Sequence, residues 1–197
     1  MRAPALPTDP EGLRPTGALP RILIAGIGNV FMGDDGFGIA VVEQLARFAL
    51  PEGAVLMDAG IRRLDLTYAL LSDYDAAILV DAVRRGYAPG SICVLDPEAP
   101  DQPHSEDETN PAGLLDAHAM DPVKVLEFVR QSGSQLRAMR VVGCEPLTLG
   151  TTGEPAMGLS APVRAAVNPA AQQVYALVTE LQRELRERPH TQAPRPA

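Results

Sequence analysis

The sequence has no tryptophan, and it has only four phenylalanines and four tyrosines among 197 residues. Its core must therefore be built from aliphatic and small side chains, which suits a β-sheet covered by helices. Two cysteines are too few for a disulfide framework. No apolar run approaches the roughly 18 to 20 residues of a membrane-spanning helix. These absences favour a single α/β domain with no membrane contact.

An excess of basic residues is also lacking, because 17 Lys and Arg stand against 25 Asp and Glu, for a net charge of −8. Binding to nucleic acid needs a basic surface, so we expect no nucleic-acid partner. The first residues lack the apolar segment of a signal peptide, which predicts a cytoplasmic protein. We expect residues 1–19 to be a disordered leader and 187–197 a flexible tail, leaving one domain over 20–186.

Between these ends, apolar strand-like runs alternate with helical patterns. The strand-like runs are 21–26, 54–58, 76–81, 91–95 and 136–143, and the helical patterns are 35–49, 63–72, 122–131 and 161–186. This alternation predicts an α/β fold, a three-layer αβα sandwich with a twisted, mostly parallel five-stranded sheet and helices on both faces. Residues 83–90 are too few for a crossover helix, so we expect the third and fourth strands to pair antiparallel. Pro169 predicts a kink or a restart in the last helix.

The most informative stretch follows the first apolar run. It reads Ala25-Gly26-Ile27-Gly28-Asn29-Val30-Phe31-Met32-Gly33-Asp34-Asp35-Gly36-Phe37-Gly38. Gly26 and Gly28 predict a sharp turn where a side chain would clash, and Asn29 is expected to brace that turn through bonds to nearby backbone. Two acids stand where the next helix begins. We assign Asp34 to capping the free N–H groups of that helix, which leaves Asp35 for chemistry.

Two further strand-like runs end in an acid, Asp58 after the second and Asp81 after the third. Ligands bind beyond the carboxyl ends of strands in such sheets. Each acid can instead serve its own turn, but together with Asp35 they crowd one edge and repel unless a positive group joins them. His118 precedes a predicted helix start at the same edge. Two carboxylates and an imidazole form a three-ligand set for a borderline divalent ion.

Other kinds of site find less support. The Gly26-Ile27-Gly28 motif lacks the third glycine of a dinucleotide-binding fingerprint, since Phe31 stands in its place. Asp58 could correspond to the acid that binds the ribose, but it lies further from the glycines than the usual spacing of about 20 residues. We therefore rank a nucleotide-binding oxidoreductase low and expect no organic cofactor. No nucleophile elbow is present for a serine hydrolase. Residues 97–116 carry several acids and no Lys or Arg, which predicts a solvated acidic flap or one that orders against a partner.

Several short motifs occur in a fixed order along the chain. They are Gly26-Ile27-Gly28-Asn29, Gly33–Gly38, Asp58-Ala59-Gly60, Leu79–Ala82, His118 before a short helix, Val142–Pro146 and Met157–Ser160. As a set they resemble the nickel–iron hydrogenase maturation endopeptidases, over roughly residues 21–186. The resemblance implies a cytoplasmic protease that removes the C-terminal extension of a hydrogenase large-subunit precursor after nickel insertion.

The same resemblance implies roles for particular residues. The metal-contacting positions of the family fall on Asp35, Asp81 and His118, and the nickel would arrive with the substrate. The family is compatible with a monomer. A nickel-sensing escort that binds the precursor without cutting it would share every one of these features. The cleaving water could be activated by the metal or by a carboxylate acting as general base, and the residues leave both open.

Overall fold

The computed structural model describes residues 18–96, 129, 131–132, 134, 136–150 and 156–187. The strands are β1 (Ile22–Ile27), β2 (Ala54–Gly60), β3 (Ala76–Ala82), β4 (Ile92–Leu95) and β5 (Ala138–Cys144). The helices are the short 3₁₀ helix η1 (Asp34–Gly36), α1 (Phe37–Leu45), α2 (Arg63–Leu70) and α4 (Ala161–Glu187). The expected leader, the tail and the acidic segment lie outside the described residues, as does nearly all of the helix expected over 122–131.

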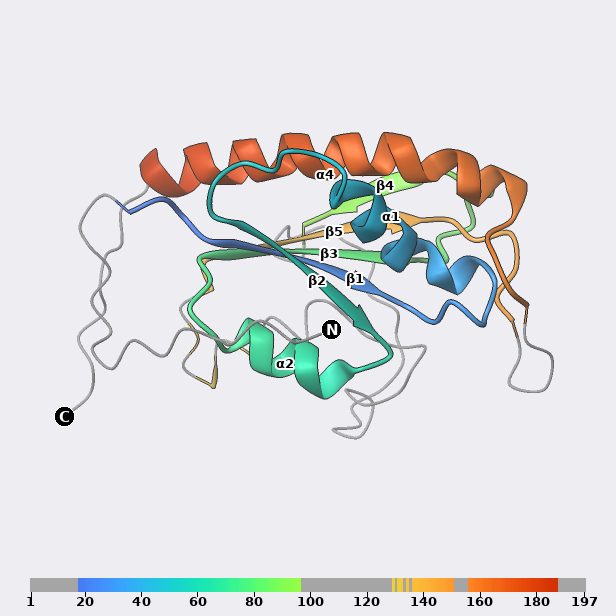
Figure 1. Cartoon of the computed structure of the whole chain (residues 1–197), viewed down its shortest axis with the longest axis horizontal. Helices are drawn as coiled ribbons and strands as arrows, with labels where there is room; N and C mark the ends of the chain where they lie inside the picture. The colour runs from blue at the N-terminus through green and yellow to red at the C-terminus, as the bar shows by residue number, and fades with distance from the viewer. Residues whose placement is uncertain are drawn as a thin grey trace.

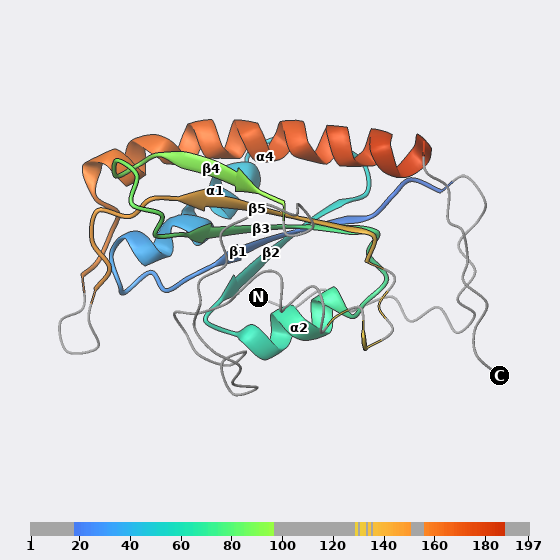
Figure 2. The ribbon, with the colours of Figure 1, turned by 180° about the vertical axis from the view of Figure 1, so that it is seen from behind.

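The five strands form one sheet in the order β2-β1-β3-β5-β4, and every pair is parallel except β4 with β5. Helices α1 and α4 cover one face of the sheet and α2 covers the other (Figure 1; Figure 2). The predicted fold class is therefore confirmed, one antiparallel strand included. No helix in the described part of the chain combines the length and apolar composition needed to cross a membrane.

The antiparallel strand has a different neighbour from the one predicted. β4 pairs with β5, which lies between β3 and β4, so the expected pairing of β3 with β4 is wrong. The connection from β3 to β4 crosses the end of β5 and bonds to it on the way. The Val83 amide donates to the Cys144 carbonyl at 2.9 Å, and the Glu145 amide donates to the Ser91 carbonyl at 2.9 Å. A short link can thus pass one strand without a helix.

Two apolar layers flank the sheet. One fills the space between the sheet and helices α1 and α4, and the other lies under α2. Phe37 is the fully buried aromatic of the first layer, and most of its other members are Val, Ile, Leu and Ala. The two layers hold β1 and β3 at the centre of the sheet, so the carboxyl ends of these strands are rigidly placed.

Helix α4 runs without interruption from Ala161 to Glu187, so the restart predicted at Pro169 does not occur. A proline inside a helix costs about 3 kcal/mol. One side of α4 is buried, and its larger buried aliphatic side chains are Val163, Val174, Val178, Leu181 and Leu185. Because each buried side chain of this size contributes roughly 1.5 to 3 kcal/mol, packing against the sheet outweighs the cost of the proline.

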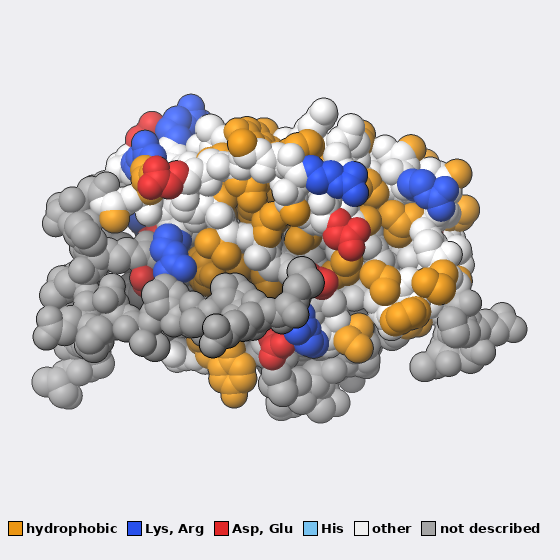
Figure 3. Space-filling model, viewed as in Figure 1, with side chains coloured by type: hydrophobic (Ala, Val, Ile, Leu, Met, Phe, Trp, Pro, Cys, Tyr) orange, Lys and Arg blue, Asp and Glu red, His pale blue; other side chains and the backbone are white. Residues whose placement is uncertain are grey.

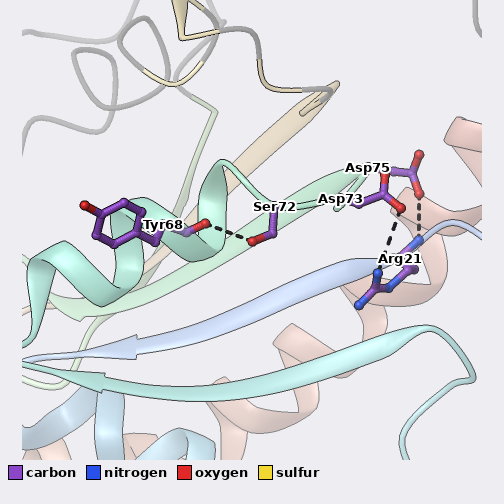
Figure 4. Close-up of polar contacts among 5 residues, drawn as sticks. All are labelled: Arg21, Tyr68, Ser72, Asp73 and Asp75. Atoms are coloured by element: carbon purple, nitrogen blue, oxygen red, sulfur yellow. Dashed lines mark hydrogen bonds and ion pairs between the residues drawn. The ribbon is translucent and has the colours of Figure 1, made fainter. Parts of the chain in front are cut away.

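The amino edge of the sheet is closed by polar contacts (Figure 4). The Arg21 amide donates to a carboxylate oxygen of Asp75 at 2.7 Å, and the Arg21 guanidinium lies 4.0 Å from the Asp73 carboxylate. The same guanidinium stacks over the Tyr74 ring, 4.9 Å from its centre. Arg21 precedes β1 and Asp75 precedes β3, so these contacts tie together the starts of the two central strands and leave the opposite edge for a site.

Candidate active site

The glycines place α1 directly against the strand backbones. A Cβ atom on Gly26 would overlap the carbonyl of Gly38, and one on Gly38 would overlap the carbonyls of Val80 and Ile27. Gly26 itself lies inside β1, so its predicted role in a sharp turn is wrong, and its function is to allow close approach of the helix. Gly28 does have the left-handed conformation that favours glycine, with φ of 124°. This packing brings η1 to the carboxyl ends of β1 and β3.

Asp34 is fully buried and bonds to segments far from it in the sequence. Its Oδ2 accepts from the Leu147 amide at 2.9 Å, the Thr148 amide at 3.1 Å and the Ser160 hydroxyl at 2.9 Å. Its Oδ1 accepts from the Ser160 amide at 2.6 Å. The carboxylate therefore joins the start of η1 to the loop after β5 and to the residue that precedes α4.

The predicted capping role of Asp34 is wrong. The N-cap positions of η1 and α1 are Gly33 and Gly36, and neither helix start has a side-chain cap bond. Burial alone raises the pKa of the Asp34 carboxyl, but the hydrogen bonds from Ser160, Thr148 and Leu147 outweigh it and hold this pKa below its ordinary value. Asp34 is thus an ionised, internally satisfied anchor, with no bonding capacity directed at a ligand.

Asp35 is held by the turn that precedes it. The Asn29 amide donates to Asp35 Oδ2 at 2.7 Å, and no other hydrogen bond to this carboxylate forms within the described part of the chain. Asn29 in turn accepts from the Phe31 amide through its side-chain oxygen at 3.0 Å and from the Met32 amide through its carbonyl at 2.9 Å. The bracing role predicted for Asn29 is confirmed, and it also orients Asp35.

Removing the Asn29 side chain should therefore weaken the turn. We expect Asn29→Ala to lower the free energy of unfolding by about 1 kcal/mol, because one partly exposed hydrogen bond is lost. That corresponds to a fall in Tm of roughly 2 to 4 °C for a chain of this length, measurable by thermal unfolding. Asn29→Asp keeps an oxygen acceptor for the Phe31 amide, so its Tm should fall less than that of Asn29→Ala. An Asn29→Ala variant of unchanged Tm but reduced activity would instead indicate a substrate contact.

Asp81 lies at the end of β3, half-buried, next to the element that carries Asp35. Its Oδ1 accepts from the Ala82 amide at 2.8 Å, and its backbone pairs with Gly143 of β5. η1 contacts β3 directly, and Gly38, in the first turn of α1, packs on the carbonyl of Val80, one residue before Asp81. The structure therefore places η1, which carries Asp35, against the end of β3 that carries Asp81.

Asp58 lies at the same edge, on the outer side of β1. It pairs in register with Gly26, and its side chain is exposed. The Asp58 carbonyl accepts from the Arg62 guanidinium at 2.9 Å, and the Gly60 carbonyl accepts from the Gly28 amide at 3.2 Å. These bonds make the ends of β1 and β2 one continuous turn, with the Asp58 carboxylate facing outward.

His118 lies outside the described residues, so the predicted set of three ligands stays a prediction. Among the residues that are described, no three His, Cys, Asp or Glu side chains are grouped to hold a metal ion. The donors that the structure does place, Asp35 and Asp81, are two carboxylates. They fit a divalent cation that a third donor and a substrate would complete.

Glu145 was not singled out by the sequence reasoning, although it lies at the same end of the sheet. Only 7% of its surface is exposed, and its Oε2 accepts from the Arg85 amide at 2.7 Å and the Tyr87 amide at 3.1 Å. The sequence pattern could have identified it, because Glu145 follows the apolar run Val141–Cys144 as Asp58 and Asp81 end their own apolar runs. Here, however, the acid turns inward to hold the loop after β3.

The two thiols do not have the character of nucleophiles. Burial raises the pKa of Cys144 to about 12, and burial also raises the pKa of the half-buried Cys93 thiol. The thiolate is the reactive form of cysteine, so both side chains remain protonated and inert near neutral pH. Neither thiol is therefore a nucleophile, and among the described residues Asp35 and Asp81 are the candidates for hydrolytic chemistry at this edge.

The fold and this edge define a class: an α/β protein whose candidate site consists of carboxylates beside the carboxyl ends of parallel strands, without a nucleotide-binding loop or a reactive thiol. Residues 39–177 match the family model described as hydrogenase maturation protease. The chain is 35% identical over 167 residues to the hydrogenase expression/formation protein HupM of Azotobacter chroococcum mcd 1, covering 84% of this chain and 75% of that protein.

Other matches agree. The chain is 32% identical over 165 residues to the hydrogenase 2 maturation protease of Escherichia coli (strain K12), covering 81% of this chain and 92% of that one. The structure of the hydrogenase maturating endopeptidase HybD from E. coli superposes with a TM-score of 0.63 at 28% identity, over 82% of this chain and 93% of that one. The chain belongs to the hydrogenase maturation protease family, and it is a protease.

Proposed function

We propose that this protease removes the C-terminal extension of a nickel–iron hydrogenase large-subunit precursor after nickel insertion, acting as a cytoplasmic monomer. Membership of the family supports a hydrogenase precursor as the substrate. The finer proposal is supported by the contact between η1, which carries Asp35, and β3, which ends just after Asp81, with Asp35 oriented by the Asn29 amide.

Recognition of nickel follows from the charge of this edge. Substrate-borne nickel, held by thiolates of the precursor, would be approached by Asp35, Asp81 and His118, a donor set suited to a borderline divalent ion. An empty precursor brings no cation to these carboxylates, so it lacks the electrostatic attraction that the loaded precursor gains. The protease then binds the nickel-loaded precursor more tightly than the empty one, and this difference in affinity makes it specific for the loaded form.

Cleavage requires water to attack the carbonyl carbon of the scissile peptide bond. The water gives up a proton as its oxygen bonds to that carbon, and the C–N bond then breaks as the leaving amine gains a proton. A carboxylate at this edge can accept and return that proton as general base and acid. The nickel of the substrate can also lower the pKa of the attacking water.

The direct test is mass spectrometry of the large-subunit precursor, loaded with nickel or empty, after incubation with the protein. We expect the loss of a C-terminal peptide only from the loaded precursor, and no loss with a folded His118→Ala variant. Cleavage of the empty precursor at the same rate would contradict recognition of nickel while leaving the protease. Nickel-dependent binding without cleavage would favour the non-cutting escort.

A further inference from the structure

Exposed apolar side chains gather at the edge that carries the carboxylates. Eight large hydrophobic side chains are exposed within the described residues, and all but Tyr68 of α2 and Tyr175 of α4 lie in segments that follow the carboxyl ends of strands. We call these six the apolar rim: Val30, Phe31, Ile61, Tyr87, Leu147 and Met157. Figure 3 shows hydrophobic side chains grouped at this end of the molecule, toward which β1, β2 and β3 point in Figure 1.

Buried carboxylates fix the backbone beneath part of the rim. The Leu147 amide bonds to Asp34, and the Tyr87 amide bonds to Glu145. Glu145 holds the whole loop after β3, because its carboxylate also accepts from the Arg85 amide and its carbonyl accepts from the Gly90 amide at 2.8 Å. A surface fixed in this way loses little conformational entropy when a partner binds. Exposed apolar side chains on a rigid backbone are typical of interaction sites.

We propose that Tyr87 contacts an apolar segment of the precursor, and that Glu145 is the positioning residue that presents Tyr87 to it. The inference rests on the proposed function and names a contact for that same substrate. The loop that carries Tyr87 follows β3, whose next-to-last residue is Asp81, so we expect a polypeptide that reaches the carboxylates to pass near this loop. Tyr87 has 59% of its surface exposed, and tyrosine is among the side chains that contribute most to interfaces.

Steady-state cleavage of the nickel-loaded precursor tests the contact. We expect Tyr87→Ala to raise KM about tenfold, as the loss of an interface anchor does, with kcat within about twofold of wild type and an unchanged Tm. Tyr68→Ala is the matched control, because Tyr68 is 69% exposed on α2, away from the rim. Its KM should equal that of the wild type. An equal KM for Tyr87→Ala and wild type would overturn the contact.

Glu145 is tested by a pair of variants. Glu145→Ala should raise KM at least as much as Tyr87→Ala, because the loop loses both carboxylate bonds. In Glu145→Gln the amide oxygen can take the place of Oε2 and accept from both amides, so KM should return toward wild type. A purely structural role predicts a lower Tm for Glu145→Ala with an unchanged KM, and that outcome would overturn the positioning role.

The failure of the proposed function would be recognised separately. If the wild type binds the precursor without cleaving it, the protease proposal fails, and the dissociation constants of the same variants then decide the inference. If the wild type neither binds nor cleaves, both are overturned. The apolar rim could instead be the contact between two copies of this chain, and sedimentation of the wild type and Tyr87→Ala tests that alternative. A wild-type dimer that becomes a monomer in Tyr87→Ala would overturn the contact with the precursor.

Discussion

Asp34→Ala is expected to lower the free energy of unfolding by about 3 kcal/mol. The substitution removes four hydrogen bonds to one buried charge and leaves the amides of Leu147, Thr148 and Ser160 without their acceptor. Each such loss costs about 1 to 3 kcal/mol when the donor is buried, and less where water can replace the carboxylate. Tm should fall by roughly 10 °C, as measured by calorimetry or by circular dichroism. A helix cap, the role predicted from the sequence, would cost only about 1 kcal/mol.

Asp34→Asn keeps the side-chain volume but removes the charge and one of the two acceptor oxygens, so it tests these properties apart from volume. The asparagine side chain has only one oxygen, so its NH₂ group must face either the Leu147 and Thr148 amides or the Ser160 amide. Two hydrogen-bond donors then face each other, and the bond is lost. We therefore expect a loss of stability close to that of Asp34→Ala, in spite of the equal size. If Asp34→Asn has the wild-type Tm, the hydrogen bonds to its two oxygens are not what stabilises the junction.

The low pKa of Asp34 also sets a pH dependence. A carboxyl whose pKa is lower in the folded than in the unfolded state contributes stability that is complete above its unfolded pKa, near 4, and that is lost as pH falls through the folded value. The wild type should therefore lose stability relative to Asp34→Ala as pH falls below about 4. A constant difference between their unfolding free energies from pH 6 to pH 3 would contradict this.

The fold was predictable from the sequence because alternating apolar runs and helical patterns are local signals. The errors all concern contacts between distant segments. Nothing within residues 83–95 indicates that β5 inserts beside β4. The residues around Asp34 do not indicate its hydrogen-bond partners, which lie 113, 114 and 126 positions further along the chain. The sequence does not distinguish the role of Gly26 from that of a turn glycine, because the absence of a Cβ atom can either permit a positive φ or make room for a neighbouring helix.

The candidate site was predictable in part for the same reason. A strand that ends in an acid is visible in the sequence, and the structure places Asp58 and Asp81 near the carboxyl ends of β2 and β3 as expected. The pattern does not reveal which way the acid turns. Glu145 shares the pattern but is buried and bonded to the loop after β3, whereas Asp58 is exposed. Among the described residues, Asp34 and Glu145 accept several backbone amides and stabilise the edge, whereas Asp35 accepts one and keeps bonding capacity for a cation.

Asp35→Asn is expected to lower kcat/KM for the nickel-loaded precursor by at least about 100-fold, the range for the loss of a charged ligand or general base. The fold should be little affected, because the asparagine oxygen can still accept from the Asn29 amide that now bonds to Oδ2. Thermal unfolding should show a Tm within about 2 °C of wild type, given that a single hydrogen bond is retained. Asp35 and Asp34 therefore give opposite results, with one variant stable and inactive and the other unstable.

Asp65→Asn is the matched control, since it removes one carboxylate and changes the net charge equally. Asp65 is exposed on α2, 3.7 Å from the Arg62 guanidinium, and surface pairs of this kind contribute little to stability. Its activity and Tm should equal those of the wild type. An active Asp35→Asn beside an inactive, fully stable Asp34→Asn would reverse the two assignments, because the buried anchor would then be the group that the reaction needs. The contrast between adjacent acids thus tests whether hydrogen-bond saturation separates structural from reactive carboxylates at this edge.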